Sequence, residues 1–183
     1  MKQFITSDYH LGHANIINYC NRPFKSLDHM NETIIRNHNQ RVKPNDIVYH
    51  VGDFCFRNSS DVKGEGVRIA YLEWEQQLNG KIIYIMGNHD RNNGIKTGIY
   101  SITIKTHNHK FNLVHNPLHY NPNYFINLVG HRHEKLDIEY NEVTGYLVNV
   151  GVDVNNFMPI TFDEVLHKIA KFNYKNNYPK LKL

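Results

Sequence analysis

The chain has 183 residues, of which 40% are hydrophobic and 21% charged, and its formal net charge is +4. These values are typical of a globular protein that can bury a core, so they exclude a disordered chain. No apolar run approaches the roughly 18 residues that span a bilayer, and the N-terminus lacks the apolar core of a signal peptide. We therefore expect a cytoplasmic protein without a membrane partner, in which Cys20 and Cys55 are reduced thiols.

Histidine is the unusual feature of the composition, with thirteen residues. Because imidazole is the commonest metal-ligating side chain and titrates near neutral pH, this excess indicates a metal site. The modest positive charge suits an anionic substrate and does not by itself require nucleic acid.

Apolar periodicity and breaker residues predict the order of secondary structure. In chain order we expect a strand over 2–6, helices over 14–19 and 27–40, a strand over 46–51, a helix over 67–78, strands over 82–86, 99–106, 110–114, 125–129, 136–140 and 146–150, and a closing helix over 161–172. Ser26 or Asp28 is expected to cap the helix from residue 27, and Thr161 with Glu164 fits a capping box. No linker interrupts this order, so we expect one α/β domain over residues 1–183.

Five of these strands end in side chains that can bind a metal: Asp8 and His10, Asp53, Asn88 and His89, His115, and His131 and His133. Taken singly, each is typical of a turn or surface residue. Ligands at the same end of the strands of a parallel or mixed sheet, however, converge in space. Their recurrence at five strand ends therefore predicts a metal site at one edge of the sheet.

These blocks resemble the calcineurin-like metallophosphoesterase superfamily over essentially the whole chain. The motifs occur in the order Asp8-x-His10, Gly52-Asp53, Gly87-Asn88-His89-Asp90, His115 and Gly130-His131-Arg132-His133, and residues 7–17 and 48–54 look like a compact bacterial and phage branch. Many relatives have a carboxylate where this chain has Phe56, so that group is absent. The resemblance implies a four-layer αββα sandwich of two mixed β-sheets flanked by helices.

The resemblance also implies two divalent metal ions. The first would be held by Asp8, His10, Asp53 and His133, and the second by Asp53, Asn88, His115 and His131. Asp53 would then bridge ions that lie about 4 Å apart and repel each other. Nitrogen and oxygen ligands without a thiolate favour a transition metal; Mn is expected first, with Fe, Zn, Ni or Co as alternatives.

The expected reaction is hydrolysis of a phosphate ester by metal-activated hydroxide. His89 would protonate the leaving oxygen, and Asp90 would orient His89 and keep it protonated. His13 or Arg132 would neutralise charge on the phosphoryl oxygens, although a surface or supporting position suits each equally well.

Without a large cap the site is open, so we expect a phosphodiester or small nucleotide as substrate, with loops 57–66 and 116–123 as specificity elements. Two alternatives are a nuclease acting on polynucleotide and a non-catalytic metal-binding scaffold on the same fold.

The remaining histidines belong to no motif. His50 is expected to pack or hydrogen-bond near the site, and His119 competes with His115 for the ligand role. The others are expected on the surface or on helix faces; they are His29, His38, His107, His109 and His167. The single tryptophan, Trp74, is expected to pack in or beside the core.

Overall fold

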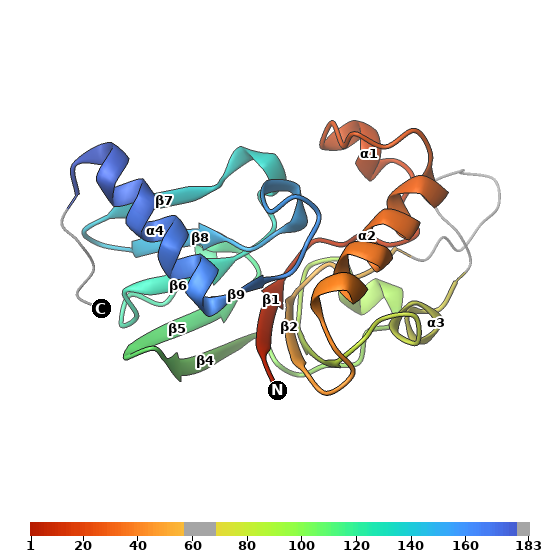
Figure 1. The fold of residues 1–183 in the computed structure, drawn as a ribbon, viewed down its shortest axis with the longest axis horizontal. Helices are drawn as coiled ribbons and strands as arrows, with labels where there is room; N and C mark the ends of the chain where they lie inside the picture. Colours follow the sequence, from red (N-terminus) through yellow and green to blue (C-terminus); the bar gives the residue numbers. More distant parts are fainter. Residues whose placement is uncertain (57–68, 179–183) are drawn as a thin grey trace.

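The structure is a computed structural model that describes residues 1–56 and 69–178. Within these ranges the chain forms two β-sheets with helices beside them (Figure 1). The strands are β1 (Gln3–Thr6), β2 (Ile47–Val51), β3 (Lys81–Ile85), β4 (Ser101–Thr106), β5 (His109–Val114), β6 (Ile126–Val129), β7 (Ile138–Asn141), β8 (Gly145–Asn149) and β9 (Ile160–Thr161). The α-helices are α1 (Ile16–Tyr19), α2 (Leu27–Arg41), α3 (Tyr71–Glu75) and α4 (Phe162–Asn176). The 3-10 turns are η1 (Asp90–Asn93), η2 (Pro117–His119), η3 (His133–Lys135) and η4 (Val152–Val154).

The first sheet has the strand order β3-β2-β1-β9. β1, β2 and β3 are parallel, and β9 pairs antiparallel with β1 through Ile5 and Ile160. β1 and β2 lie at the centre of this sheet and are mostly buried, which explains their nearly continuous apolar character. The sequence does not predict β9, because two residues are too few for a recognisable pattern.

The second sheet has the order β4-β5-β6-β8-β7. Its three central strands β5, β6 and β8 are parallel, whereas β4 and β7 are antiparallel edge strands. Both sheets are thus mixed, and helices flank them, as the family resemblance implies. The two strands predicted over 99–106 and 110–114 are β4 and β5, which pair as an antiparallel hairpin.

The largest apolar cluster lies between the two sheets. It joins Ile5 and Val51 of the first sheet to Phe111 and Leu128 of the second, and α4 adds Ile169 and its neighbours. A second cluster lies on the other face of the first sheet, since alternate residues of β3 belong to different clusters. This second cluster takes its helical side chains from α1, α2 and α3, including Met30, Ile34 and Trp74.

The predicted helix caps are confirmed at two helices. Ser26, rather than Asp28, accepts a hydrogen bond from the His29 N–H at the start of α2. Thr161 and Glu164 form the capping box of α4, which continues four residues beyond the predicted end at residue 172.

The helix predicted over 67–78 is wrong in its length. α3 covers only Tyr71–Glu75, because the N–H groups of Gln77 and Leu78 bond three residues back and tighten the chain into turns. Residues 67 and 68, like loop 57–66, lie outside the described residues. The helix predicted over 14–19 is also shorter, since α1 begins at Ile16.

His38, expected on the surface or on a helix face, lies on the buried face of α2. Its Nδ1 lies 2.8 Å from the Tyr9 hydroxyl, and its Nε2 lies 2.8 Å from the Asn79 carbonyl oxygen. His50 is also buried and packs against the rings of Tyr9 and Phe54, as expected.

Both cysteines are free and buried, so the expectation of reduced thiols is met. Across the described ranges, the helices are too short or too polar to cross a membrane.

Candidate metal centre

Three parallel strands of each sheet end at one rim of the molecule, and each strand is followed by at least one polar residue of the candidate centre. β1 leads to Asp8 and His10, and β2 leads to Asp53. The remaining four are β3, followed by Asn88; β5, followed by His115; β6, followed by His131 and His133; and β8, followed by Asp153. The strand-end convergence predicted from the sequence is therefore present in both sheets.

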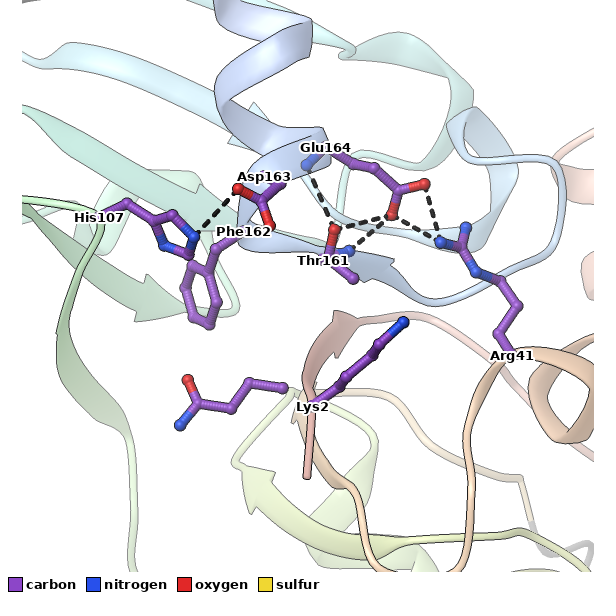
Figure 2. A pocket seen from close by; sticks show the side chains of 8 residues that line it. Lys2, Arg41, His107, Thr161, Phe162, Asp163 and Glu164 are labelled. Atoms are coloured by element: carbon purple, nitrogen blue, oxygen red, sulfur yellow. Dashed lines mark hydrogen bonds and ion pairs between the residues drawn. The ribbon is translucent and has the colours of Figure 1, made fainter. Parts of the chain in front are cut away.

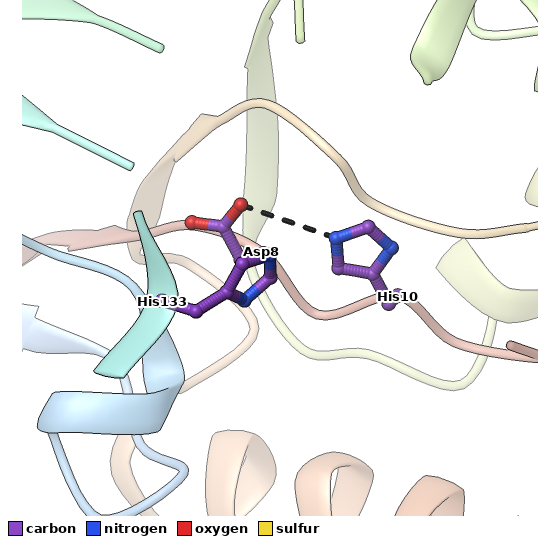
Figure 3. A group of neighbouring side chains, drawn as sticks. All are labelled: Asp8, His10 and His133. Carbon is purple, nitrogen blue, oxygen red and sulfur yellow. Dashed lines mark ion pairs between the residues drawn. The ribbon is translucent and has the colours of Figure 1, made fainter. Parts of the chain in front are cut away.

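The first group of candidate ligands comprises Asp8, His10 and His133 (Figure 3). Each offers one ligand atom, and these three atoms lie within 4.8 Å of one another. Nε2 of His10 is 4.0 Å from a carboxylate oxygen of Asp8 and 3.6 Å from Oδ2 of Asp53. Asp53 therefore borders this group although it belongs to the next one.

The second group comprises Asp53, His115 and His131, again with ligand atoms within 4.8 Å of one another. Oδ2 of Asp53 lies 3.3 Å from Nε2 of His115. The amide oxygen of Asn88 lies 3.0 Å from the same His115 nitrogen and 2.9 Å from Nδ1 of His131. All four predicted ligands of the second ion thus face one small volume.

Hydrogen bonds fix which ring nitrogen faces the centre in two of these histidines. Nδ1 of His115 donates to the Val51 carbonyl oxygen at 2.8 Å, which leaves Nε2 for a ligand. Nδ1 of His133 lies 2.9 Å from the carboxylate of Asp153, with the same consequence. Partners of this kind orient the ring and fix the tautomer of metal-binding histidines.

Five of the seven predicted ligands have backbone conformations that are uncommon for residues other than glycine. Their φ angles are positive: Asp8 +59°, His10 +51°, Asp53 +57°, His131 +68° and His133 +46°. Left-handed non-glycine residues cost energy and collect at functional sites, where surrounding structure holds them in place.

The loops after β1 and β2 hold each other in these conformations. The N–H groups of Asp8, His10 and Leu11 donate to the carbonyl oxygens of Gly52, Asp53 and Phe54 at 3.0–3.1 Å. The two loops therefore continue the pairing of the parallel strands β1 and β2 past the end of the sheet.

Glycines allow the ligand loops to approach each other closely. A Cβ atom on Gly130 would collide with the Ser7 hydroxyl and the Asp8 carboxylate, and one on Gly87 would collide with Asp53. Gly52 combines a φ of +86° with close contact to the His115 ring. Each of these motif glycines therefore provides space for a ligand side chain.

Burial and mutual charge shift the pKa values of the ligands strongly. Burial raises the pKa of Asp8, whereas at Asp53 the effect of burial is outweighed by the hydrogen bond and charge of His115, so its pKa is lowered. At His115, in turn, burial lowers the pKa, but the hydrogen bonds to Asp53 and Val51 and the charges of Asp8 and Asp53 together outweigh burial and raise the pKa to about 9. Burial lowers the pKa of His10 well below its usual value.

The donor set fits divalent metal ions. Nε2 of His10 is buried and has no hydrogen-bond partner among the described residues, although it faces two buried carboxylates. Imidazole nitrogens, carboxylates and an amide oxygen are the ligands that Mn, Fe, Zn, Ni and Co accept. A cation placed between these groups would offset the charge of the buried Asp8 and Asp53.

His89 lies beside the first group of ligands. Its ring centroid is 5.4 Å from that of His10 and 6.4 Å from that of His13, and the side chain is partly exposed. The N–H of His89 donates to Oδ1 of Asp53 at 2.9 Å. The residue is thus anchored by its main chain while its ring faces the centre.

The structure contradicts the role expected for Asp90. Its carboxylate is fully buried and accepts hydrogen bonds from the N–H groups of Gly87, Asp53 and Phe54 at 2.7–2.9 Å. Within the described ranges it has no hydrogen bond with the His89 ring. Because Asp90 begins the tight turn η1, its side chain folds back over the Asp53 loop and joins the loops after β2 and β3.

The two residues expected to meet phosphoryl oxygens differ in position. The His13 ring is buried, stacks on Phe56 with centroids 4.2 Å apart, and places Nδ1 3.3 Å from Nδ1 of His10. Arg132 is exposed and makes no side-chain hydrogen bond or ion pair with any described residue. His119, the alternative to His115 as a metal ligand, is exposed and belongs to neither group of ligands.

Two residues of the centre are missing from the sequence-based prediction. Asp153 holds His133, and the buried Arg22 binds both carboxylate oxygens of Asp153 at 2.8 and 2.9 Å. Arg22 also donates to the carbonyl oxygens of Asp8 and Tyr9. Asp153 follows the strand predicted over 146–150, so the rule used for the other strand ends could have found it.

A separate hollow of about 500 Å³ lies at the opposite end of β1 (Figure 2). Arg41 binds both oxygens of Glu164 there at 2.7–2.8 Å, and His107 pairs with Asp163 at 3.0 Å. Its charges are largely paired with each other, and it contains none of the predicted site residues.

The chain is similar to known proteins in sequence and in fold. The family model for calcineurin-like phosphoesterases matches residues 1–180. MJ1445, an uncharacterized protein of Methanocaldococcus jannaschii, is 36% identical over 177 residues, which cover 93% of this chain and 92% of that protein. The crystal structure of AQ665, a protein of unknown function from Aquifex aeolicus, has a TM-score of 0.62 and 22% identity and covers 91% of this chain and 98% of that one, which shows a shared fold. Since the family model matches nearly the full length, the chain belongs to the calcineurin-like phosphoesterase family.

Proposed function

We propose that this protein hydrolyses a phosphodiester or small nucleotide with the help of two divalent metal ions. The observation that carries the proposal is the position of Asp53. Its Oδ2 lies 3.6 Å from Nε2 of His10 in the first group and 3.3 Å from Nε2 of His115 in the second. One carboxylate oxygen is thus shared by two sets of ligands, as a bridging residue requires.

Under this proposal Asp8, His10, Asp53 and His133 hold one ion, and Asp53, Asn88, His115 and His131 hold the other. When bound, the ions lower the pKa of water to supply the nucleophile, and they neutralise charge on the phosphoryl oxygens. Asn88 contributes a neutral oxygen, which keeps the net positive charge of its ion high. We expect Mn to support activity, with Fe, Zn, Ni or Co as substitutes.

His89 is the proposed general acid. Its ring lies beside the ligand His10 and is partly exposed, and within the described part of the chain no hydrogen bond occupies its ring nitrogens. It can therefore hold a proton at the face from which the leaving oxygen departs. His13 lies on the same side and supports His10 through the contact between their Nδ1 atoms.

The test uses the full chain, freed of metal with a chelator and reloaded in turn with Mn, Fe, Co, Ni or Zn. We expect two metal equivalents and hydrolysis of bis-p-nitrophenyl phosphate, faster than that of p-nitrophenyl phosphate. Asp53→Asn should lose both ions and the activity, whereas Asp163→Asn, an exposed aspartate on α4, should keep both.

Two bound ions without hydrolysis of either ester, whichever metal is used, would overturn the proposal in favour of a metal-binding scaffold. Activity confined to polynucleotide and strongly reduced by salt would replace the small substrate by nucleic acid.

A further inference from the structure

A second hollow, of about 370 Å³, adjoins the proposed metal centre. It lies where the end of β3 meets the start of β4 and the end of β5, so it lies between the two sheets at their shared rim. Asn88 and His115 form one wall, and they are also proposed ligands of the second ion. Its size falls within the range of about 300–1,000 Å³ that is common for small-molecule sites.

The rest of the lining is uncharged. Met86, Tyr100, Asn116 and His119 contribute to it, and none of the described lining residues is aspartate, glutamate, lysine or arginine. The Tyr100 side chain is 64% exposed, and neither it nor His119 packs against another aromatic ring within the described ranges. Free ring faces with amide and imidazole groups beside them suit a flat, uncharged group with polar edges, such as a nucleobase.

The hollow lies away from the proposed general acid. His89 does not line it; the His89 ring is instead near His10, Phe56 and His13, with centroid separations of 5.4–6.4 Å. Because the leaving group departs towards His89, the hollow faces the substituent that stays on phosphorus.

Building on the proposed function, we infer that the substrate is a phosphodiester whose retained substituent is a nucleoside, with the base bound by Tyr100 and His119. In the reaction, a water oxygen bonds to phosphorus and the bond from phosphorus to the leaving oxygen breaks. The leaving oxygen takes a proton, and the products are an alcohol and a nucleoside monophosphate.

Two esters with the same leaving group test this inference: the p-nitrophenyl ester of thymidine 5'-monophosphate and methyl p-nitrophenyl phosphate. We expect kcat/KM to favour the thymidine ester. Tyr100→Ala should reduce that preference by roughly 5- to 150-fold, the usual effect of removing an aromatic ring that stacks on a base. Tyr100→Phe should keep the preference, and so should Tyr174→Ala, which removes an even more exposed tyrosine side chain from α4.

Equal kcat/KM for the two esters, or a preference that survives both Tyr100→Ala and His119→Ala, would overturn the inference. A binding measurement separates this failure from failure of the proposed function. If the chain hydrolyses neither ester with Mn, Fe, Co, Ni or Zn, the proposed function fails. Calorimetry then tests whether the hollow binds a nucleoside. Tighter binding of thymidine 5'-monophosphate than of inorganic phosphate, with loss of that difference in Tyr100→Ala, would support the inference. Equal binding of the two would overturn it.

Discussion

The carboxylate of Asp153 lies 2.9 Å from Nδ1 of His133 and is itself held by the buried guanidinium of Arg22. Burial lowers the pKa of His133, but the hydrogen bonds to Asp153 and Cys20 and the charges of Asp8 and Asp153 together outweigh burial and raise the pKa to about 10. Asp153, which is not a proposed metal ligand, therefore controls the orientation and charge of the proposed ligand His133.

Asp153→Asn should weaken binding of one of the two ions by roughly 10- to 100-fold, because His133 loses the partner that orients it. Titration calorimetry with Mn would measure the affinity of each site, with a thermal melt to confirm folding. Asp163→Asn on the surface of α4 is the matched control. Unchanged affinities at both sites would contradict this role of Asp153.

Asp90→Asn should act mainly on stability. Its carboxylate accepts three main-chain N–H groups in a buried position, and an amide can accept fewer of them. We expect the free energy of unfolding to fall by about 1–3 kcal/mol, measured by urea denaturation of the metal-free chain. Loss of activity with unchanged stability would instead support the original prediction that Asp90 orients His89.

His89→Gln should leave both metal equivalents in place and slow hydrolysis most for esters with poor leaving groups, since only these need a proton on the departing oxygen. The measurement is kcat for phenyl esters with a series of ring substituents, compared between the variant and the parent chain. An equal loss across the series would argue against a general acid at this position.

Gly130→Ala should disturb the first group of ligands, because the added methyl group meets the Ser7 hydroxyl and the Asp8 carboxylate. We expect destabilisation of about 1–3 kcal/mol, as for other overpacked sites, together with weaker metal binding. Gly98→Ala is the control, since a Cβ atom there has nothing within 4 Å. Equal behaviour of the two variants would show that the loops adapt to the extra atom.

The buried His38 should make stability depend on pH. Burial lowers its pKa from 6.5 to about 4, so between these values the unfolded chain binds the proton more readily than the folded one. The contribution of the neutral His38 to the free energy of unfolding is complete above about pH 6.5. It falls by roughly 3 kcal/mol in total as the pH drops to about 4. Urea denaturation of the metal-free chain from pH 4.5 to 7.5 should show a shallower fall for His38→Gln than for the parent. Parallel curves would contradict this.

The sequence predicts the strand ends well because a polar residue after an apolar run is a local signal. Asp8, Asp53 and His115 each follow such a run, and the parallel order of the strands brings them together. The neighbouring glycines are also visible in the sequence, but the sequence does not show why they are needed. Gly130, for example, makes room for the carboxylate of Asp8, which is more than a hundred residues away in the chain.

The contacts that the sequence does not reveal depend on distant partners. His38 is buried by contacts with Tyr9 and Asn79, which are 29 and 41 residues away. Asp90 follows His89 directly, which suggests that the two interact, yet its carboxylate bonds to main-chain groups 36 and 37 residues earlier. Neighbours in sequence point in different directions at a tight turn, and no local pattern reveals which contact forms.

The hydrogen bonds between residues 8–11 and residues 52–54 restrict how the length of this protein can vary. Surface loops usually tolerate inserted or deleted residues. Here a single insertion in either loop would shift every following N–H relative to its carbonyl partner and turn Asp8 or Asp53 away from the centre. Variation in chain length among natural relatives should therefore be concentrated elsewhere, and the number of residues from Asp8 to Leu11 should be as constant as their identity.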